Sequence, residues 1–65
     1  RLELVMRTAE GVELFYNSDT NTYMSEDMDA VIAAIKRDMH SNNILDVLLA
    51  TSLFEKMQNA TLISE

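Results

Sequence analysis

The chain has 65 residues, which is enough for one small domain (residues 1–65) with a narrow margin of stability. It contains no cysteine, so disulfides and thiolate zinc sites are excluded and a reducing compartment such as the cytoplasm is expected. Its net charge of −6 argues against direct binding to nucleic acid, because affinity for phosphates comes from clustered Lys and Arg. No apolar run is long enough to predict a signal peptide or a contact with a membrane.

Residues 2 to 17 show the alternation of a β-hairpin around the only glycine, Gly11. A three-residue loop that ends at Gly11 fits the turn class that needs a left-handed residue in its last position. This loop predicts five cross-strand pairs, which are Thr8 with Val12, Met6 with Leu14, Leu4 with Tyr16, Arg7 with Glu13, and Val5 with Phe15. The register leaves apolar side chains on both faces of the hairpin, and a single helix can cover only one of them.

Residues 25 to 40 are predicted to form an amphipathic helix. Ser25 suits the N-cap, since its hydroxyl can accept hydrogen bonds from free amides of the first turn. Acidic residues near the start and basic residues near the end match the helix dipole. The apolar residues fall on one arc of the helix, which would pack across the hairpin: Met28, Val31, Ile32, Ile35 and Met39.

Residues 43 to 65 allow two interpretations. Their composition favours a second helix, but their apolar residues scatter around a helical wheel and define no single face. A helix that is apolar on all sides needs more burial than so small a domain provides. We therefore predict strands over residues 44 to 50 and 53 to 57 and a last strand near Leu62 and Ile63. The helical alternative requires a dimer partner to cover the second face.

The predicted fold class is α+β. A small antiparallel sheet is built on the N-terminal β-hairpin, one amphipathic helix packs across it, and C-terminal strands extend it. The alternative order is two strands followed by two helices. Because the chain has neither disulfides nor a metal motif, self-association as a homodimer is the remaining way for it to gain stability.

The motifs for chemistry are incomplete. Part of a calcium-loop spacing is present, but Thr22 and Met28 stand where that loop needs Gly and Glu; the matching residues are Asn17, Asp19, Asn21 and Ser25. His40 is the only residue suited to acid-base chemistry, and its neighbours on a helix would point in different directions. We expect no enzyme activity, no cofactor and no metal site.

Negative charge is concentrated before residue 30, where seven of the eleven acids face two bases. The predicted function is that of a non-enzymatic protein-binding module, a small acidic regulator, inhibitor or adaptor whose partner has a basic surface. Its contacts would be an acidic rim and an apolar sheet face, formed by Asp19, Glu26, Asp27, Asp29, Val5, Phe15 and Tyr23. The alternatives are a nucleic-acid-mimicking inhibitor of a DNA- or RNA-handling enzyme and an obligate structural subunit of a larger assembly.

Overall fold

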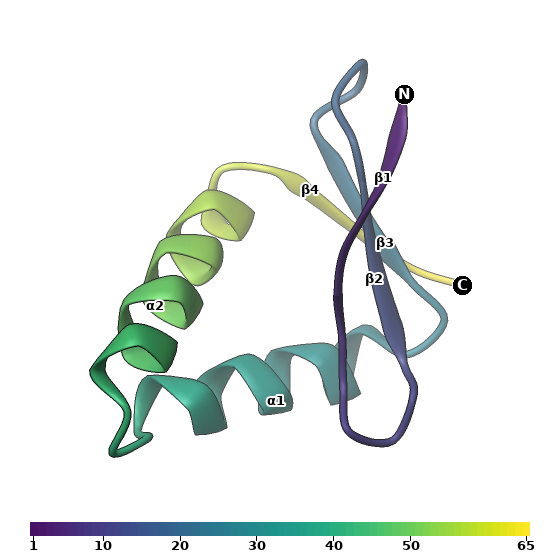
Figure 1. Cartoon of the computed structure of the whole chain (residues 1–65). Coiled ribbons are helices and arrows are strands. Elements are labelled where there is room, and N and C mark those ends of the chain that lie inside the picture. The colour runs from purple at the N-terminus through teal and green to yellow at the C-terminus, as the bar shows by residue number, and fades with distance from the viewer.

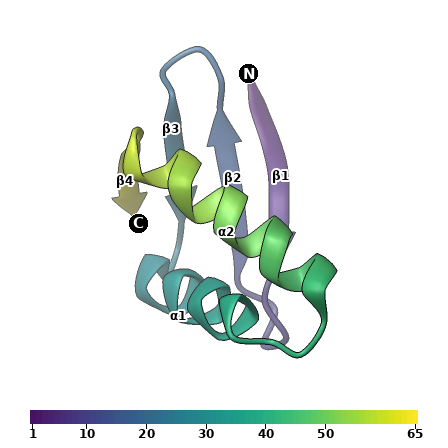
Figure 2. The same cartoon turned by 90° about the vertical axis from the view of Figure 1, so that its left-hand side faces the viewer.

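A computed structural model describes all 65 residues (Figure 1). The elements follow the order β1 (Leu2–Arg7), β2 (Glu13–Asn17), β3 (Thr22–Ser25), α1 (Met28–Met39), α2 (Ile44–Gln58) and β4 (Thr61–Ser64). The four strands form one sheet in the order β1-β2-β3-β4. Strands β1 to β3 are antiparallel, whereas β4 runs parallel to β3. The α+β class is confirmed, with a mixed sheet and two helices on the same side of it (Figure 2).

The hairpin of β1 and β2 forms as predicted near its turn. Gly11 has a φ of 93°, in the left-handed region that the three-residue loop requires. The Thr8 amide donates to the Val12 carbonyl at 2.8 Å. The predicted pairs Met6 with Leu14 and Arg7 with Glu13 are both present in the register.

Further from the turn, a β-bulge at Val5 makes the predicted register wrong. The pairing shifts between Leu4 and Met6, so that Leu4 lies opposite Phe15 and not opposite Tyr16. The predicted pair of Val5 with Phe15 does not form either, because Val5 is the extra residue of the bulge. The shift moves Leu4 to the face of the sheet that Phe15 occupies.

The turn between β2 and β3 is organised by Asn21, whose φ of 51° is in the left-handed region. Its side-chain oxygen accepts from the Tyr16 hydroxyl at 2.9 Å, and its side-chain nitrogen donates to the Asn59 carbonyl at 3.0 Å. Its own carbonyl accepts from the Thr61 amide at 3.1 Å. Asn21 therefore connects the strand meander to the end of α2 and the start of β4. Strand β3 was not predicted from the sequence.

Helix α1 begins at Met28, three residues later than predicted. The N-cap is Asp27 and not Ser25, and the Asp27 carboxylate accepts from the Ala30 amide at 3.1 Å. Ser25 ends β3 with 3% of its surface exposed, and its hydroxyl accepts from the Asp27 amide at 3.3 Å. The Ser64 hydroxyl on β4 accepts from the Met28 amide at 3.1 Å. Amides at the start of α1 thus find acceptors in the N-cap Asp27 and in serines of β3 and β4.

Residues 44 to 58 form helix α2, so the predicted strands over residues 44 to 50 and 53 to 57 are wrong. The alternative with two helices is confirmed, and the last strand near Leu62 and Ile63 is present as β4. Asn43 caps α2, because its side-chain oxygen accepts from the Leu45 amide at 2.9 Å. The scattered apolar pattern has a physical reason: α2 is apolar on the side that packs against α1 and also on a second, exposed side.

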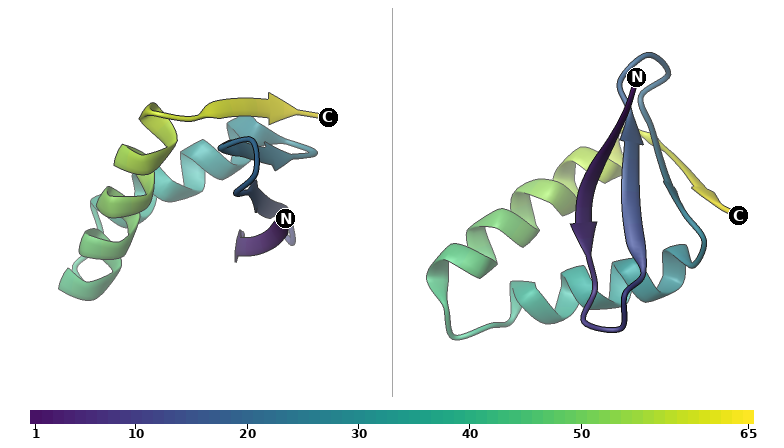
Figure 3. Two further views of the ribbon diagram at one scale, coloured as in Figure 1. Left: turned by 90° about the horizontal axis from the view of Figure 1, so that it is seen from above. Right: turned by 45° about the vertical axis from the view of Figure 1, so that its right-hand side comes forward.

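The core lies between the sheet and the two helices. Its buried residues come from β2, β3, α1 and α2, and they are Leu14, Tyr23, Met28, Val31, Ile35, Ala50 and Met57. Helix α1 crosses under the sheet, while α2 packs on α1 and stands away from the strands (Figures 1 and 3). Neither helix combines the length and apolar character that a membrane crossing requires.

Candidate functional site

The face of the sheet that carries no helix has one apolar side chain from each strand. The register places Leu4 opposite Phe15, Phe15 opposite Met24, and Met24 opposite Ile63. Because neighbouring residues of a strand point to opposite faces, these side chains lie on the side away from the buried Leu14. Leu4 is 51% exposed and Ile63 41%, while the two central residues are half-buried. We call these four residues the apolar row.

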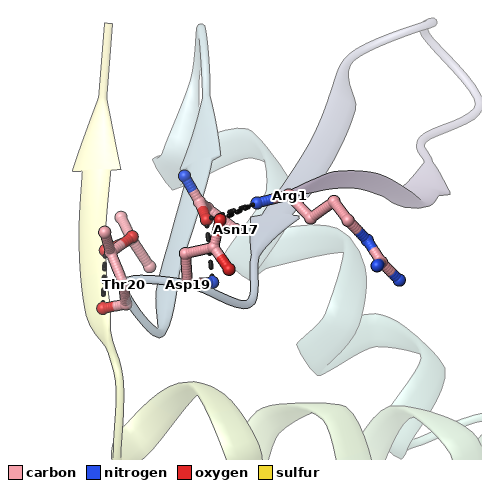
Figure 4. A network of polar contacts seen from close by, with 5 residues as sticks. Arg1, Asn17, Asp19 and Thr20 are labelled. Carbon is pink, nitrogen blue, oxygen red and sulfur yellow. Dashed lines mark hydrogen bonds and ion pairs between the residues drawn. The ribbon is translucent and has the colours of Figure 1, made fainter.

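The turn between β2 and β3 lies at one end of this sheet and carries Asp19 (Figure 4). The main-chain nitrogen of Arg1 donates to the Asp19 carboxylate at 2.6 Å and to the Asn17 side-chain oxygen at 3.1 Å. The same Asn17 oxygen accepts from the Asp19 amide at 3.0 Å. The Arg1 and Asp19 side chains are highly exposed, so this contact orders the turn and contributes little to stability.

The other predicted acidic residues lie at the opposite end of β3. Glu26 and Asp29 are exposed near the start of α1, and the carboxylate of Asp27 is engaged in capping that helix. The four residues of β3 separate this group from Asp19, which corresponds to about 13 Å of extended chain. The structure therefore divides the predicted acidic rim into two groups at opposite ends of β3, one on each side of the apolar row, which runs across the strands.

Two of the three predicted apolar contact residues lie away from the apolar row. Tyr23 is 5% exposed and belongs to the core, so it offers little area to a partner. Its ring centroid is 4.5 Å from that of Tyr16. Burial, and secondarily the nearby Tyr16, raise the pKa of Tyr23 above its ordinary value of 10.0. Val5 lies at the bulge and lines a hollow on the helix side of the sheet. Only Phe15 belongs to the apolar row.

Sequence reasoning missed the other three members of the apolar row, each for a different reason. The bulge that places Leu4 beside Phe15 leaves no mark on the regular alternation of β1. Strand β3 has four residues, too few for an alternating pattern to stand out, so Met24 was assigned to no strand. The strand at Leu62 and Ile63 was predicted, but its position beside β3 was not.

A hollow of about 970 Å³ separates α2 from the sheet. Its apolar lining comes from the sheet and from α2, with Val5, Met6 and Tyr16 on one wall and Leu49, Ala50 and Leu53 on the other. Charged side chains also line it, among them Asp46 and Lys56. The outer surface of α2 continues this apolar character, since Leu45 and Leu48 are each 59% exposed.

The candidate residues for metal binding and acid-base chemistry do not converge. No group of three His, Asp or Glu side chains could hold a metal ion together. Of the residues with calcium-loop spacing, Ser25 is buried at the far end of β3 from Asn21. His40 is the exposed C-cap of α1 and makes no side-chain hydrogen bond to another residue. The apolar row and α2 are therefore the surfaces that call for a functional explanation.

Comparison with known proteins identified no relative of this chain. No protein-family model matches it, and no curated protein or solved structure matches it either. The function of the chain is therefore inferred from the shape, charge and apolar character of its own surfaces.

Proposed function

We propose that this chain is a non-enzymatic protein-binding module that contacts its partner through the apolar row. The observation that supports the proposal is the row itself, in which all four strands contribute an apolar side chain to a sheet face without a helix. Phe15 lies near its centre, and aromatic residues are enriched at the centres of protein interfaces. A contiguous exposed apolar patch is typical of an interaction site.

The exposed members of the row can contribute usefully to binding. Leu4 and Ile63 are about half exposed, and Leu2, at the end of β1, is 55% exposed. Covering each of these side chains would contribute about 1 kcal/mol, half of the value for burying a fully exposed aliphatic residue. Three such residues around a half-buried aromatic can form the centre of an interface, with surrounding polar contacts to exclude water.

Acidic residues flank the row on both sides, with Asp19 in the turn before β3 and Glu26 and Asp29 after β3. Together with the net charge of −6, this distribution favours a partner with a basic surface around an apolar centre. Such a module would act as a small regulator, inhibitor or adaptor, and the absence of cysteine suits the cytoplasm. Charge steering of this kind weakens as salt screens the exposed groups.

Two neighbouring residues on β4 provide a matched test. Ile63 and Leu62 are each 41% exposed, but only Ile63 lies in the apolar row, while Leu62 points to the helix side. Proteins retained by the immobilised chain would be compared for wild type, Ile63→Ser and Leu62→Ser. We expect a specific partner to be lost with Ile63→Ser and kept with Leu62→Ser. Equal retention by Ile63→Ser and wild type would contradict the proposal.

The alternative function, nucleic-acid mimicry, requires a different arrangement of the acidic residues. A mimic needs acids arranged in a continuous line, whereas β3 separates Asp19 from Glu26 and Asp29. Excess duplex or single-stranded nucleic acid must displace a mimic from its partner but need not displace an adaptor. Adding such a competitor to the same retention experiment distinguishes the two functions.

A further inference from the structure

Helix α2 presents four residues to the hollow with the spacing of a coiled-coil seam. Asp46, Leu49, Leu53 and Lys56 follow one another at intervals of three, four and three, and all four line the hollow. Leu49 is 63% exposed, although it stands at the middle of this stripe. We call these four residues the α2 stripe. Leu53 is half-buried against the core, whereas Leu49 lies largely uncovered within the chain.

The α2 stripe is complementary to itself when two copies of the helix run antiparallel. With Thr51 at the crossing point, Leu49 of one copy lies beside Leu53 of the other, and Asp46 lies beside Lys56. Symmetry repeats each contact, so that two ion pairs enclose four leucines. Neither Asp46 nor Lys56 forms an ion pair within the chain, where the only two pairs involve the Arg1 amine with Asp19 and Arg7 with Glu13. A second copy supplies the missing partner for both charges.

The hollow provides a second wall for an incoming helix. Val5, Met6 and Tyr16 on the sheet face α2 across it, and α2 stands off the strands except at its C-terminal end, where Asn21 and β4 join it to the sheet (Figure 3). A helix seated there would contact the α2 stripe on one side and these sheet residues on the other. A small molecule fits less well, because ligand sites enclose most of the ligand surface and this hollow is open.

The apolar area on α2 is large enough to matter for association. Four aliphatic side chains in its first half are between 59% and 70% exposed: Ile44, Leu45, Leu48 and Leu49. At about 100 Å² each, they expose about 400 Å² per copy. Leu49 lines the hollow, whereas the other three lie on the remaining exposed surface of α2 and would be covered where the partner's sheet wall reaches them. A standard interface buries about 800 Å² per partner, so the dimer needs both the helix and the sheet wall.

The distribution of charge favours a second copy at this helix. Residues 1 to 29 carry a net charge of −5, whereas residues 30 to 65, which include α2, carry −1. Two copies that meet through α2 therefore join their nearly neutral halves and keep their acidic halves apart. A contact between the acidic halves of two copies would bring like charges together.

We propose that the chain forms a symmetric dimer in which each copy places its α2 antiparallel into the hollow of the other. The dimer would supply the cover for the second apolar face of α2 and add stability to a domain with a small core. This interface is separate from the proposed function, because the apolar row lies on the opposite face of the sheet. Such a dimer presents two apolar rows that point outward.

A charge-exchange experiment tests the antiparallel pairing. Sedimentation equilibrium would measure dimerisation of wild type, Asp46→Lys, Lys56→Asp and the double variant. Each single change turns two ion pairs into two repulsive pairs and should raise the dissociation constant by about tenfold or more. The double variant exchanges the partners and should recover affinity close to that of wild type. A monomeric wild type, or a double variant no tighter than the single ones, would overturn the proposal.

A second pair of variants tests which apolar surface is used. Leu49→Asp places two carboxylates at the centre of the dimer and should weaken it by about a hundredfold. Leu4→Asp on the apolar row is the matched control, since Leu4 is 51% exposed and should leave the dimer intact. Circular dichroism verifies that both variants keep their helix content. Loss of the dimer with Leu4→Asp but not with Leu49→Asp would place the interface on the sheet and refute the assignment to α2. Partner retention tests the proposed function and sedimentation tests the dimer, so failure of one proposal is distinguished from failure of the other.

Discussion

The bridge made by Asn21 gives a prediction that separates hydrogen bonding from backbone strain. Its side chain joins Tyr16 on β2 to Asn59 at the end of α2, while its backbone holds a φ of 51°. Asn21→Gly removes both side-chain hydrogen bonds and adopts this φ without steric strain, but it adds conformational entropy to the unfolded chain. Asn21→Ala removes the same bonds and also forces an unfavourable backbone conformation. The difference between the two variants therefore reports the strain less the extra unfolded-state entropy of glycine.

The expected magnitudes follow from these contacts. Each hydrogen bond of Asn21 lies at exposed atoms and contributes about 0.5–1 kcal/mol, so Asn21→Gly should lower the free energy of unfolding by about 1–2 kcal/mol. The left-handed conformation should make Asn21→Ala less stable than Asn21→Gly by about 1 kcal/mol. A chain of this size has a total stability of about 3–10 kcal/mol, so both losses are large fractions of it.

Urea unfolding followed by circular dichroism measures these changes, with all variants at one protein concentration because dimerisation would shift the midpoint. Tyr16→Phe serves as a control that removes only the bond from the hydroxyl to Asn21. Equal stability of Asn21→Gly and Asn21→Ala would refute the role of the backbone conformation. Wild-type stability in both variants would refute the bridge itself.

Two further predictions concern the core and the start of α1. Because the pKa of Tyr23 is raised above 10.0 in the folded chain, its contribution to stability is complete below pH 10.0 and is lost as pH rises through the folded pKa. Alkaline unfolding should therefore be weaker in Tyr23→Phe, and an identical pH profile would contradict this reasoning. Asp27→Ala should lower the free energy of unfolding by about 1 kcal/mol through loss of the N-cap, with Asp27→Asn close to wild type. Ser64→Ala should cost about 1 kcal/mol by leaving the Met28 amide without its acceptor. Thermal unfolding of Asp27→Ala, Asp27→Asn and Ser64→Ala measures these losses in the free energy of unfolding. If Asp27→Asn were as unstable as Asp27→Ala, the loss would come from the charge of Asp27 and not from capping.

Local patterns in the sequence predicted much of the fold. The three-residue loop at Gly11, and with it the pairs of Met6 with Leu14 and Arg7 with Glu13, depended on alternation and turn chemistry over a few residues. Helix α1 depended on a single apolar arc that packs on the sheet. In these elements the local preferences agree with the tertiary structure, so the sequence was sufficient to predict them, except at the start of α1, where Asp27 and not Ser25 is the N-cap.

The errors occurred where contacts distant in sequence decide the outcome. The bulge at Val5 adjusts β1 to its partner strand and is invisible in the alternation of β1 alone. A helix over residues 44 to 58 was not predicted, because its apolar residues define no single face. A helix with two apolar faces produces such a scattered pattern. The sequence did contain one indication of this helix, which is Asn43 directly before Ile44, a residue type that favours the N-cap position. Its side chain caps α2 in the structure. Of the predicted contact residues, Phe15 lies on the sheet face without a helix, while Tyr23 lies in the core on β3, a strand that the sequence did not predict.

The parallel pairing of β3 with β4 has a consequence for the order in which the chain folds and opens. The strands β1, β2 and β3 close through short turns, whereas the contact of Met28 with Ser64 spans 36 residues. Closing that longer loop carries a larger entropic cost, so β4 should dock after the meander and leave before it. Its amides should accordingly exchange with solvent faster than those of β2 in hydrogen-exchange measurements. Departure of β4 would also convert β3 into an unprotected sheet edge, the point from which aggregation of a partly opened chain is expected to begin.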